Sequence, residues 1–409
     1  MHSVFADLHV HLGCADGSAV KISASPQLTL EGILRTARSD KGLDVVGVID
    51  AATTGGLADL RGAVAAGALR PLPGGGLVAR DGLVVLPGAE VELDVAGHRV
   101  HFAAFVPGLE ETNHLLRRLA GHARNVRLSS QRAHGLTVAA LCAAVDDQRG
   151  MVWPAHAFTP HRGLYGCAVA TALAPESVGL GPEALGRFAG VELGLSADTD
   201  MADRLSELAA STFITNSDAH SLGTMARECN RLLVAGTPDW SEVRACLLRE
   251  GGRAVACNYG LAPQLGKYHR TVCVRCGVQA EGPPPVRRCP ACGSTRVVMG
   301  VFDRLTEIAD RPQAVTPDHR PPYVHQIPLA FLPGIGEATA ARLRSGVGPE
   351  LALLHEADLS EIARVGGARA AAAIGAARAG RLSLRAGGGG HYGGVVGGTL
   401  AASLPPGPA

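Results

Sequence analysis

Short apolar runs alternate with longer helix-like segments over the first 260 residues of the chain. This alternation is typical of repeated βα units. The expected strands are Val4–Val10, Val45–Ile49, Leu83–Leu86, Val100–Val106, Met151–Pro154, Gly190–Leu193 and Thr212–Thr215. The expected helices are Thr29–Ser39, Glu110–Ala123, Thr137–Gln148, Met201–Ala210 and Trp240–Glu250. Seven strands separated by helices predict an α/β fold, with a barrel of parallel strands over residues 1–260.

The pattern changes after residue 260. Residues 264–300 hold four closely spaced cysteines, a proline cluster and short β-like stretches, which predict a small separate module. Residues 301–326 are interpreted as a linker, and residues 327–386 are expected to be helical with glycine turns. Residues 387–409 are rich in glycine and proline, so we expect them to form a flexible tail.

The charge is balanced over the whole chain but not along it. The chain has 38 Lys and Arg residues against 37 Asp and Glu residues, a net charge of +1. Residues 1–260 have a net charge of −5, and residues 261–409 have a net charge of +6. A basic C-terminal part attached to an acidic body favours contact of that part with a polyanion.

The composition also bears on the compartment. The chain has no uninterrupted run of about eighteen apolar residues and no secretory signal pattern at its N-terminus. Its ten cysteines are too few for a disulfide-dense scaffold of this length. We therefore expect a cytoplasmic protein that does not interact with membranes.

Residues that can bind metal ions stand at the ends of nearly every expected strand. His9 and His11 are two residues apart on an extended chain, which places both imidazoles on one face, and Asp218 and His220 repeat this spacing. Because the strand ends of a barrel converge on one face, we expect these side chains to meet there. A single histidine in such a place is more often structural, but the whole set suffices for two or three divalent ions. The set is His9, His11, Asp16, Asp50, Glu90, His101, His156, Asp218 and His220.

A metal cluster of this composition suits the hydrolysis of phosphoesters. One ion lowers the pKa of a bound water, and neighbouring ions stabilise the phosphoryl and leaving oxygens. The sequence has no Walker loop, no dinucleotide fingerprint and no serine–histidine–aspartate order that would indicate another chemistry. We therefore expect a hydrolase that uses zinc, magnesium or manganese.

The motifs at these positions resemble those of the polymerase-and-histidinol-phosphatase (PHP) family of metal-dependent phosphoesterases. The matching segments are DLHVH at 7–11, Asp16-Gly17, GVID ending at Asp50, GAE at 88–90, His101, His156 and NSDAH at 216–220. The resemblance implies a distorted seven-stranded β/α barrel that binds up to three metal ions.

The same resemblance implies a ligand set. One ion would be held by His9, His11, Glu90 and Asp218. Glu90 would bridge to a second ion held by His101 and His156, and Asp16 and His220 would hold a third. The sequence departs from the family at Ala51, where a histidine is common, so that either the third site is lost or Asp50 serves as a ligand.

Four cysteines form two CxxC units: Cys273 with Cys276, and Cys289 with Cys292. Twelve residues separate the units, and a glycine follows each, which is the arrangement of a structural zinc site. A redox-active CxxC motif would not explain the doubled pattern. Arginines surround the cysteines, and they favour contact with a nucleic-acid backbone; the alternative is a solvated face that stabilises a small module. The arginines singled out are Arg275, Arg287 and Arg288.

The segment FLPGIG at 331–336, followed by Glu337–Leu343, resembles a helix-hairpin-helix. Gly334 and Gly336 would let backbone N–H groups approach a phosphate at the start of a helix. Residues 359–374 are a weaker candidate for a second hairpin. An ordinary helix turn is the alternative, but next to a zinc module and a phosphoesterase centre we favour DNA binding.

These three parts together predict nucleic acid as the substrate. Their order, with motifs at Glu192–Ser196, His319–Tyr323 and Gly387–Gly393, resembles that of DNA repair endonucleases within the PHP family. The resemblance implies a nick on the 5′ side of deaminated bases (uracil, hypoxanthine and xanthine) and of abasic sites, in DNA containing damaged bases. Recruitment by a sliding clamp stays open. A small-molecule phosphatase with the same barrel and a non-catalytic DNA-binding protein are the two alternatives.

A lesion-specific endonuclease has to distinguish a keto group from an amino group, which is simplest once the base has been extruded into a pocket. Phe158, Tyr165 and Glu192 are candidates for the wall of that pocket, with core packing as the alternative for the two aromatic residues. Arg227 is a candidate for contact with a DNA phosphate; the alternatives are an ion pair with Glu228 and a role on a helix face.

Overall fold

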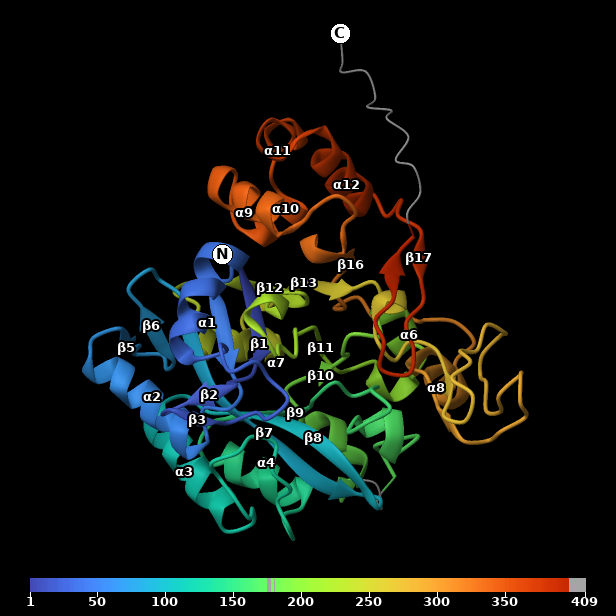
Figure 1. Cartoon of the computed structure of the whole chain (residues 1–409). Coiled ribbons are helices and arrows are strands. Elements are labelled where there is room, and N and C mark those ends of the chain that lie inside the picture. Colours follow the sequence, from blue (N-terminus) through green and yellow to red (C-terminus); the bar gives the residue numbers. More distant parts are fainter. Residues whose placement is uncertain (175–177, 180, 397–409) are drawn as a thin grey trace.

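A ten-stranded mixed sheet organises the first part of the chain. Figure 1 shows this sheet in a computed structural model, which describes residues 1–174, 178, 179 and 181–396. The central strands β1 (His2–Val10), β4 (Val45–Val48) and β7 (Val84–Val95) run parallel to one another. Nearly all their residues are buried, because both faces of the sheet are covered, which explains their continuous apolar runs.

Beyond β7 the strand direction reverses. β7 and β8 (His98–Phe105) form an antiparallel hairpin, and β9 (Met151–Pro154) is antiparallel to β8. Ala96 and Gly97 make the two-residue turn, both with positive φ, as hairpin turns of this length require. The prediction of parallel strands throughout is therefore wrong. The reversal matters for the site, because it brings His101 back level with Glu92 of β7.

All seven expected strands are present, and the α/β class is confirmed. β10 (Val191–Glu192) and β11 (Phe213–Ile214) pair with each other in a separate two-stranded sheet. Among the described residues the main-chain ladders do not join into a closed ring. Side chains cross the gap between β11 and β1 instead: Leu8 N–H donates to Asn216 Oδ1 at 2.9 Å.

Several strands extend the sheet beyond the predicted seven. β12 (Cys229–Val234) and β13 (Ala254–Leu261) continue it past β1, and β16 (Tyr323–Gln326) pairs in parallel with β13. The short strands β5 (Leu69–Pro71) and β6 (Leu77–Ala79) form the opposite edge. The prediction that residues 301–326 are a linker is wrong at both ends, because α8 (Val301–Ile308) packs on the core of the barrel region and β16 belongs to the sheet.

Helices cover the sheet. Four of the five expected helices are present, as α1 (Leu30–Thr36), α3 (Leu109–Ala120), α4 (Val138–Asp146) and α7 (Trp240–Leu248). The segment expected to form a helix at 201–210 contains only the end of α6 (Thr199–Ala202) and a 3₁₀ turn at Ser206–Leu208. The sequence analysis missed α2 (Thr54–Ala65), which Thr53 caps by accepting a hydrogen bond from Gly56 N–H. No helix in the described part of the chain has the length and hydropathy to cross a bilayer.

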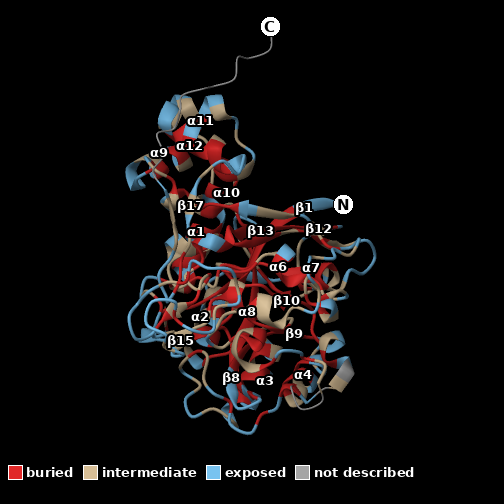
Figure 2. Ribbon diagram, turned by 90° about the vertical axis from the view of Figure 1, so that its right-hand side faces the viewer, coloured by how far each residue is buried: buried red, intermediate tan, exposed pale blue. Residues whose placement is uncertain are grey.

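The C-terminal helices form a small domain with its own apolar core. They are α9 (Glu337–Gly346), α10 (Glu350–His355), α11 (Leu359–Gly366) and α12 (Ala368–Arg378). Figures 1 and 2 show this domain projecting from one end of the sheet region, next to β13. A buried ion pair ties the two parts together, with Lys41 Nζ 2.5 Å from Glu350 Oε2.

The cysteine module and the glycine-rich run lie side by side (Figure 1). The module includes β14 (Val272–Cys273) and β15 (Val297–Val298), and the run is bounded by the paired strands β17 (Leu384–Arg385) and β18 (Gly394–Val395). We call residues 384–395 the glycine strap. Its main chain bonds to the segment that enters the module: Arg270 N–H donates to Gly387 O at 3.0 Å, and Gly387 N–H to Gln264 O at 2.8 Å.

The expected flexible tail is therefore wrong for residues 387–396, and residues 397–409 lie outside the described residues. Glycine is required here by close packing, since a Cβ atom on Gly387 would lie 2.4 Å from Gly266 O. The composition alone could not reveal this, because a glycine run that permits close backbone approach looks like a flexible one.

Substitution of Gly387 by alanine tests this packing. Because the added methyl meets main-chain oxygen on both sides, Gly387→Ala is expected to lower the free energy of unfolding by about 1–3 kcal/mol, measured by chemical denaturation. Gly186→Ala is the matched control, since nothing lies within 4 Å of its added Cβ. Equal stability of the two variants would contradict the close packing of the strap.

Candidate metal centre

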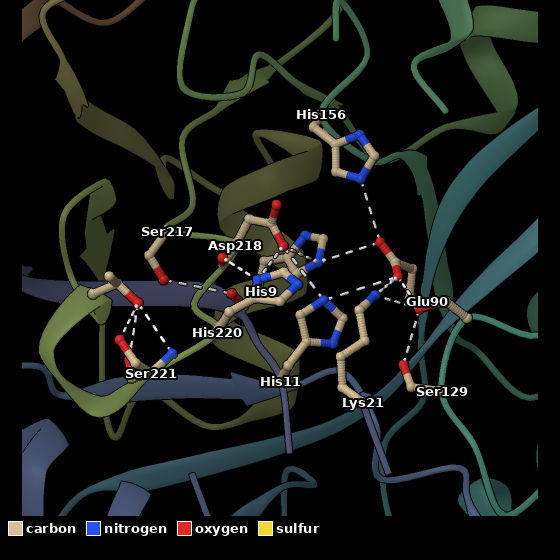
Figure 3. A network of polar contacts seen from close by, with 12 residues as sticks. His9, His11, Lys21, Glu90, Ser129, His156, Ser217, Asp218, His220 and Ser221 are labelled. Atoms are coloured by element: carbon tan, nitrogen blue, oxygen red, sulfur yellow. Dashed lines mark hydrogen bonds and ion pairs between the residues drawn. The ribbon is translucent and has the colours of Figure 1, made fainter. Parts of the chain in front are cut away.

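His9 and His11 face two carboxylates at the end of β1 (Figure 3). His9 Nε2 lies 3.6 Å from both Glu90 Oε1 and Asp218 Oδ1, and His11 Nε2 lies 3.3 Å from Asp218 Oδ1. Both Nε2 atoms are buried without a hydrogen-bond partner in the described part of the chain. Buried ring nitrogens of this kind, pointed at carboxylate oxygens, fit the ligands of a divalent metal ion.

Two further clusters share residues with the first. In one, Glu90 Oε1 lies 2.8 Å from His101 Nδ1 and 3.3 Å from His156 Nε2. In the other, ligand atoms of His11, Asp218 and His220 lie within 4.8 Å of one another. Glu90 and His11 thus each belong to two of these clusters, and Glu90 is the carboxylate that two clusters share. The structure brings together seven of the expected ligands: His9, His11, Glu90, His101, His156, Asp218 and His220.

The two carboxylates that face His9 and His11 are held in the ionised form. Burial alone would raise the pKa of Glu90, but His101 and Lys21 outweigh it, and the pKa lies well below its usual range. Burial would also raise the pKa of Asp218, but His11, His9 and His220 outweigh it, and this pKa too lies well below its usual range. Ionised oxygens are the form that binds metal.

Asp50 and Asp16 do not join these clusters. Asp50 is buried one layer outside the ligands, where it bonds His11 Nδ1 at 3.0 Å and accepts from Leu12 N–H at 2.7 Å. Asp16 is exposed, and its main-chain N–H donates to Asp59 Oδ1 at 3.0 Å. The expectation that either residue is a ligand is therefore wrong. Asp50 instead fixes the ring of His11, as a carboxylate behind a metal-binding histidine commonly does.

Glu192 plays the same part for His9. The expectation that it lines a lesion pocket is wrong, because its carboxylate is fully buried behind the histidine. His9 Nδ1 lies 3.0 Å from Glu192 Oε1, and three other donors reach the same carboxylate: Trp153 Nε1 at 3.3 Å, His156 N–H at 3.1 Å and Asn216 Nδ2 at 2.9 Å. This network orients the Nε2 atom of His9 towards Glu90 and Asp218.

Two site residues have strained main chains. His156 has φ of 33° and Asp218 has φ of 45°, both in the left-handed region that non-glycine residues rarely adopt. The cost of such conformations is commonly tolerated where a side chain has to reach a functional position. Arg227 helps to hold the loop of Asp218, because its guanidinium donates to Ser217 O at 2.7 Å and Asp218 O at 3.0 Å.

Lys21 is a residue of the site that the sequence analysis missed. Its ammonium lies 2.7 Å from Glu90 Oε2 and 2.6 Å from Ser130 Oγ, beside the metal clusters (Figure 3). Burial would lower the pKa of Lys21, but Glu90, Asp50 and Asp218 outweigh it, so that the pKa is raised and the residue stays cationic. One signal was available: the chain has only three lysines, Lys21, Lys41 and Lys267, among 38 basic residues.

The four cysteines form the expected cluster. Cys273 Sγ lies 3.6 Å from Cys292 Sγ, and Cys276 Sγ lies 3.5 Å from Cys289 Sγ. A tetrahedral site with Zn–S bonds of about 2.3 Å places its sulfur atoms slightly less than about 4 Å apart. The spacing therefore fits one zinc ion.

Replacement of Cys276 by serine tests the cysteine site. We expect Cys276→Ser to lower the zinc content by one equivalent per chain, measured by elemental analysis of the purified protein, because one thiolate ligand is lost. The control is Cys142→Ser, which alters a buried cysteine of the barrel region that belongs to no metal cluster of the described residues. An unchanged zinc content in Cys276→Ser would contradict the assignment.

The residues expected to contact DNA or the lesion have mixed outcomes. Phe158 and Tyr165 are fully buried and stacked on each other in the core, so their expected place in the wall of a lesion pocket is wrong. The guanidinium of Arg227 is engaged by two carbonyls and the Tyr392 hydroxyl, which leaves it a positioning role and not the expected phosphate contact. The remaining candidates are exposed, and their contact with DNA stays a prediction: Arg275, Arg287, Arg288, Gly334 and Gly336.

An open cleft borders the metal centre. Glu90, His101, His156, Asp218 and His220 line it. Three other segments complete the lining: the loop after β9 with Thr159, His161 and Arg162, the loop after β10 with Ser196, and the segment between β13 and the cysteine module with Lys267 and Tyr268. The metal centre can therefore be reached by a large substrate.

Comparisons with known proteins agree with this arrangement. No family model matches the chain. The chain is 41% identical over 398 residues to the uncharacterized protein YqxK of Bacillus subtilis, covering 96% of this chain and 99% of that protein. It is 34% identical over 222 residues to the uncharacterized protein MJ0043 of Methanocaldococcus jannaschii, covering 50% of this chain and 28% of that protein.

Two solved structures are similar over nearly the whole chain. One is the lesion-specific endonuclease PfuEndoQ from Pyrococcus furiosus, with a TM-score of 0.82, 28% identity and 98% of each chain covered. The other is endonuclease Q in complex with a 27-mer duplex that has an abasic lesion at the active site, with a TM-score of 0.81, 29% identity and 96% of each chain covered.

Proposed function

The chain belongs to the endonuclease Q family, and from this premise we propose that it hydrolyses the phosphodiester on the 5′ side of deaminated bases and abasic sites in DNA. One observation supports the proposal above all others: three clusters of imidazoles and carboxylates lie beside an open cleft and overlap at Glu90 and His11. Overlapping clusters of this kind suit a phosphodiester, whose attacked phosphorus and leaving oxygen both need stabilisation.

The clusters fit divalent metal ions, because they contain buried imidazole nitrogens without hydrogen-bond partners in the described residues and ionised carboxylates. Such ions, when bound, supply Lewis acidity that activates a water and neutralises phosphoryl oxygens. Glu192 and Asp50 fix the orientation of His9 and His11. Lys21 adds a fixed positive charge on the cleft side of Glu90, where a negatively charged phosphate would be attracted.

The parts outside the barrel region favour DNA over a small phosphate ester. Lys267 and Tyr268, in the segment that leads into the cysteine module, line the cleft. The cleft is therefore not built from loops of the barrel region alone. Gly334 and Gly336 are exposed just before α9, and Gly334 lies beside the guanidinium of Arg369, so that a phosphate backbone can approach there. A small phosphate ester would need neither feature.

Nicking of defined duplexes tests the proposal. End-labelled duplexes with one uracil, one hypoxanthine or one abasic site are incubated with Mg²⁺ or Mn²⁺, and EDTA serves as the control. Cleavage 5′ of the lesion, absent from the undamaged duplex and from the EDTA reaction, is expected. Turnover of free phosphomonoesters without DNA cleavage would favour the phosphatase alternative, and binding without cleavage would favour a non-catalytic DNA-binding protein.

A further inference from the structure

One wall of the metal-site cleft contains groups that phosphodiester hydrolysis does not use. Lys267 and Tyr268 come from the segment between β13 and β14, and His161 comes from the loop after β9. They line the same cleft as Glu90, His156 and Asp218, and none of them belongs to a metal cluster of the described residues. A nucleotide whose phosphate reaches the metal centre would have its base next to such a wall.

Among the described residues, Lys267 is the one lysine whose ammonium has no paired partner. Lys21 and Lys41 each form an ion pair with a glutamate. Over residues 1–174, 178, 179 and 181–396, Lys267 Nζ has neither a hydrogen-bond acceptor nor a carboxylate partner, although the residue is half-buried. Its closest described interaction is with the ring of Tyr268, whose centroid lies 5.5 Å from Nζ. The cleft therefore offers a cationic donor without a partner.

Aromatic rings stand beside this donor. His161 meets Tyr268 edge to face, with ring centroids 5.3 Å apart. Burial, together with the charges of Arg162 and Lys267, lowers the pKa of His161, so that its ring is neutral near pH 7. Flat neutral rings at the edge of a nucleic-acid site can stack on an unpaired base.

Two other polar groups of this wall have partners within the protein. Arg162 Nε donates to Glu92 Oε2 at 2.5 Å, and Ser196 Oγ accepts from Tyr268 N–H at 3.4 Å. The glycine strap fixes the segment itself, because Gly390 N–H donates to Lys267 O at 2.9 Å and Gly393 N–H donates to Leu265 O at 3.0 Å. Lys267 is thus a free donor on a main chain that is held in place.

Deamination of a base creates a hydrogen-bond acceptor that this donor can bind. Deamination replaces an exocyclic amino group, which donates hydrogen bonds, with a keto oxygen, which accepts them. An ammonium group can only donate. It therefore stabilises a keto oxygen, whereas an amino group in the same place would bring two donors face to face, and sites built on such a contact discriminate strongly.

We propose that Lys267 distinguishes deaminated bases from the amino-bearing bases from which they derive: the extruded base packs against the rings of Tyr268 and His161, and its keto oxygen accepts a hydrogen bond from Lys267 Nζ. This inference rests on the proposed function. It adds a difference between two kinds of lesion: a deaminated base can bind Lys267, whereas an abasic site has no base and cannot. Lys267 thereby determines specificity for the lesion, whereas the metal centre performs the hydrolysis.

The test compares two lesions in one enzyme. Single-turnover nicking rates are measured for duplexes that differ only at the lesion, which is uracil or a stable abasic analogue. In Lys267→Met the ratio of the uracil rate to the abasic rate is expected to fall at least about tenfold relative to the wild type, because a charge-assisted hydrogen bond is lost. Lys267→Arg keeps a cationic donor and is expected to retain most of the ratio.

Arg70→Met is the matched control, because it removes an exposed cation from β5 at the opposite edge of the sheet and should leave the ratio unchanged. An unchanged ratio in Lys267→Met overturns the inference, both when the two rates fall together, as a phosphate contact predicts, and when neither falls. Failure of the wild type to nick either lesion overturns the proposed function instead, so the two failures are distinct.

Discussion

Asp218→Ala is expected to lower the rate of DNA nicking by about 10³-fold or more while binding of lesion DNA stays measurable. Asp218 Oδ1 faces His9, His11 and His220 within 3.3–3.6 Å, so its loss removes a carboxylate that faces three imidazoles of the metal centre. A metal ion contributes several kcal/mol to stabilisation of a phosphoryl transition state, and about 4 kcal/mol corresponds to a factor of about 10³. Single-turnover nicking and gel-shift binding measure the two effects.

The control for Asp218→Ala is Asp59→Ala. Asp59 bonds the main chain of Asp16 and belongs to no metal cluster of the described residues. Elemental analysis of both proteins adds a measurement that does not depend on activity, because the Asp218 variant should bind less metal in the barrel region. Full nicking activity in Asp218→Ala would contradict the assignment of the metal centre.

Glu192→Gln is expected to lower nicking by about 100-fold, although the residue does not touch the cleft. The Glu192 carboxylate is hydrogen-bonded to four groups, from His9, Trp153, His156 and Asn216. Glutamine has the same shape but replaces one acceptor oxygen with a donor, so that at least one of these groups loses its partner. The ring of His9 is then less firmly oriented.

A readout specific to orientation accompanies this variant. Metal affinity, measured by titration with Mn²⁺, should fall together with activity, because an outer carboxylate acts through its histidine. Glu242→Gln is the control, since Glu242 forms an ion pair with Arg253 far along the chain from the ligands and lies outside the clusters of the described residues. Loss of activity in Glu192→Gln with unchanged metal affinity would contradict the positioning role.

The strands and most of the ligands were predictable because their signals are local. Alternation along a strand is a property of two or three residues, so the spacing of His9 and His11 alone placed both rings on one side of β1. The strand ends then located Glu90, His156 and Asp218 at a common rim. The cysteine cluster was predictable for the same reason, because a CxxC unit is a single turn.

The sequence did not predict whether a carboxylate faces the metal clusters or lies behind one of their histidines. Both Asp50 and Glu90 come after a short apolar run in the sequence, yet Glu90 lies within β7 and faces the clusters, whereas Asp50 lies behind His11. The difference depends on the packing of β4 and β7 against β1, which spans more than 80 residues of sequence. Asp16 was misplaced because its motif lies in a loop, where no periodicity fixes the direction of a side chain.

The sequence by itself determined the α/β class, the histidines of the candidate metal centre and the zinc-type cysteine cluster, since each depends on the regular geometry of one strand or one turn. Only the tertiary structure decided the position of Lys21 beside Glu90, the packing of the glycine strap and the place of Lys267 in the lining of the cleft. The physical reason is that these features are contacts between segments distant in sequence: Gly390 meets Lys267 across more than 120 residues. No local sequence pattern indicates such a contact, because the contact forms, and stabilises the protein, only when the two segments meet in the folded chain.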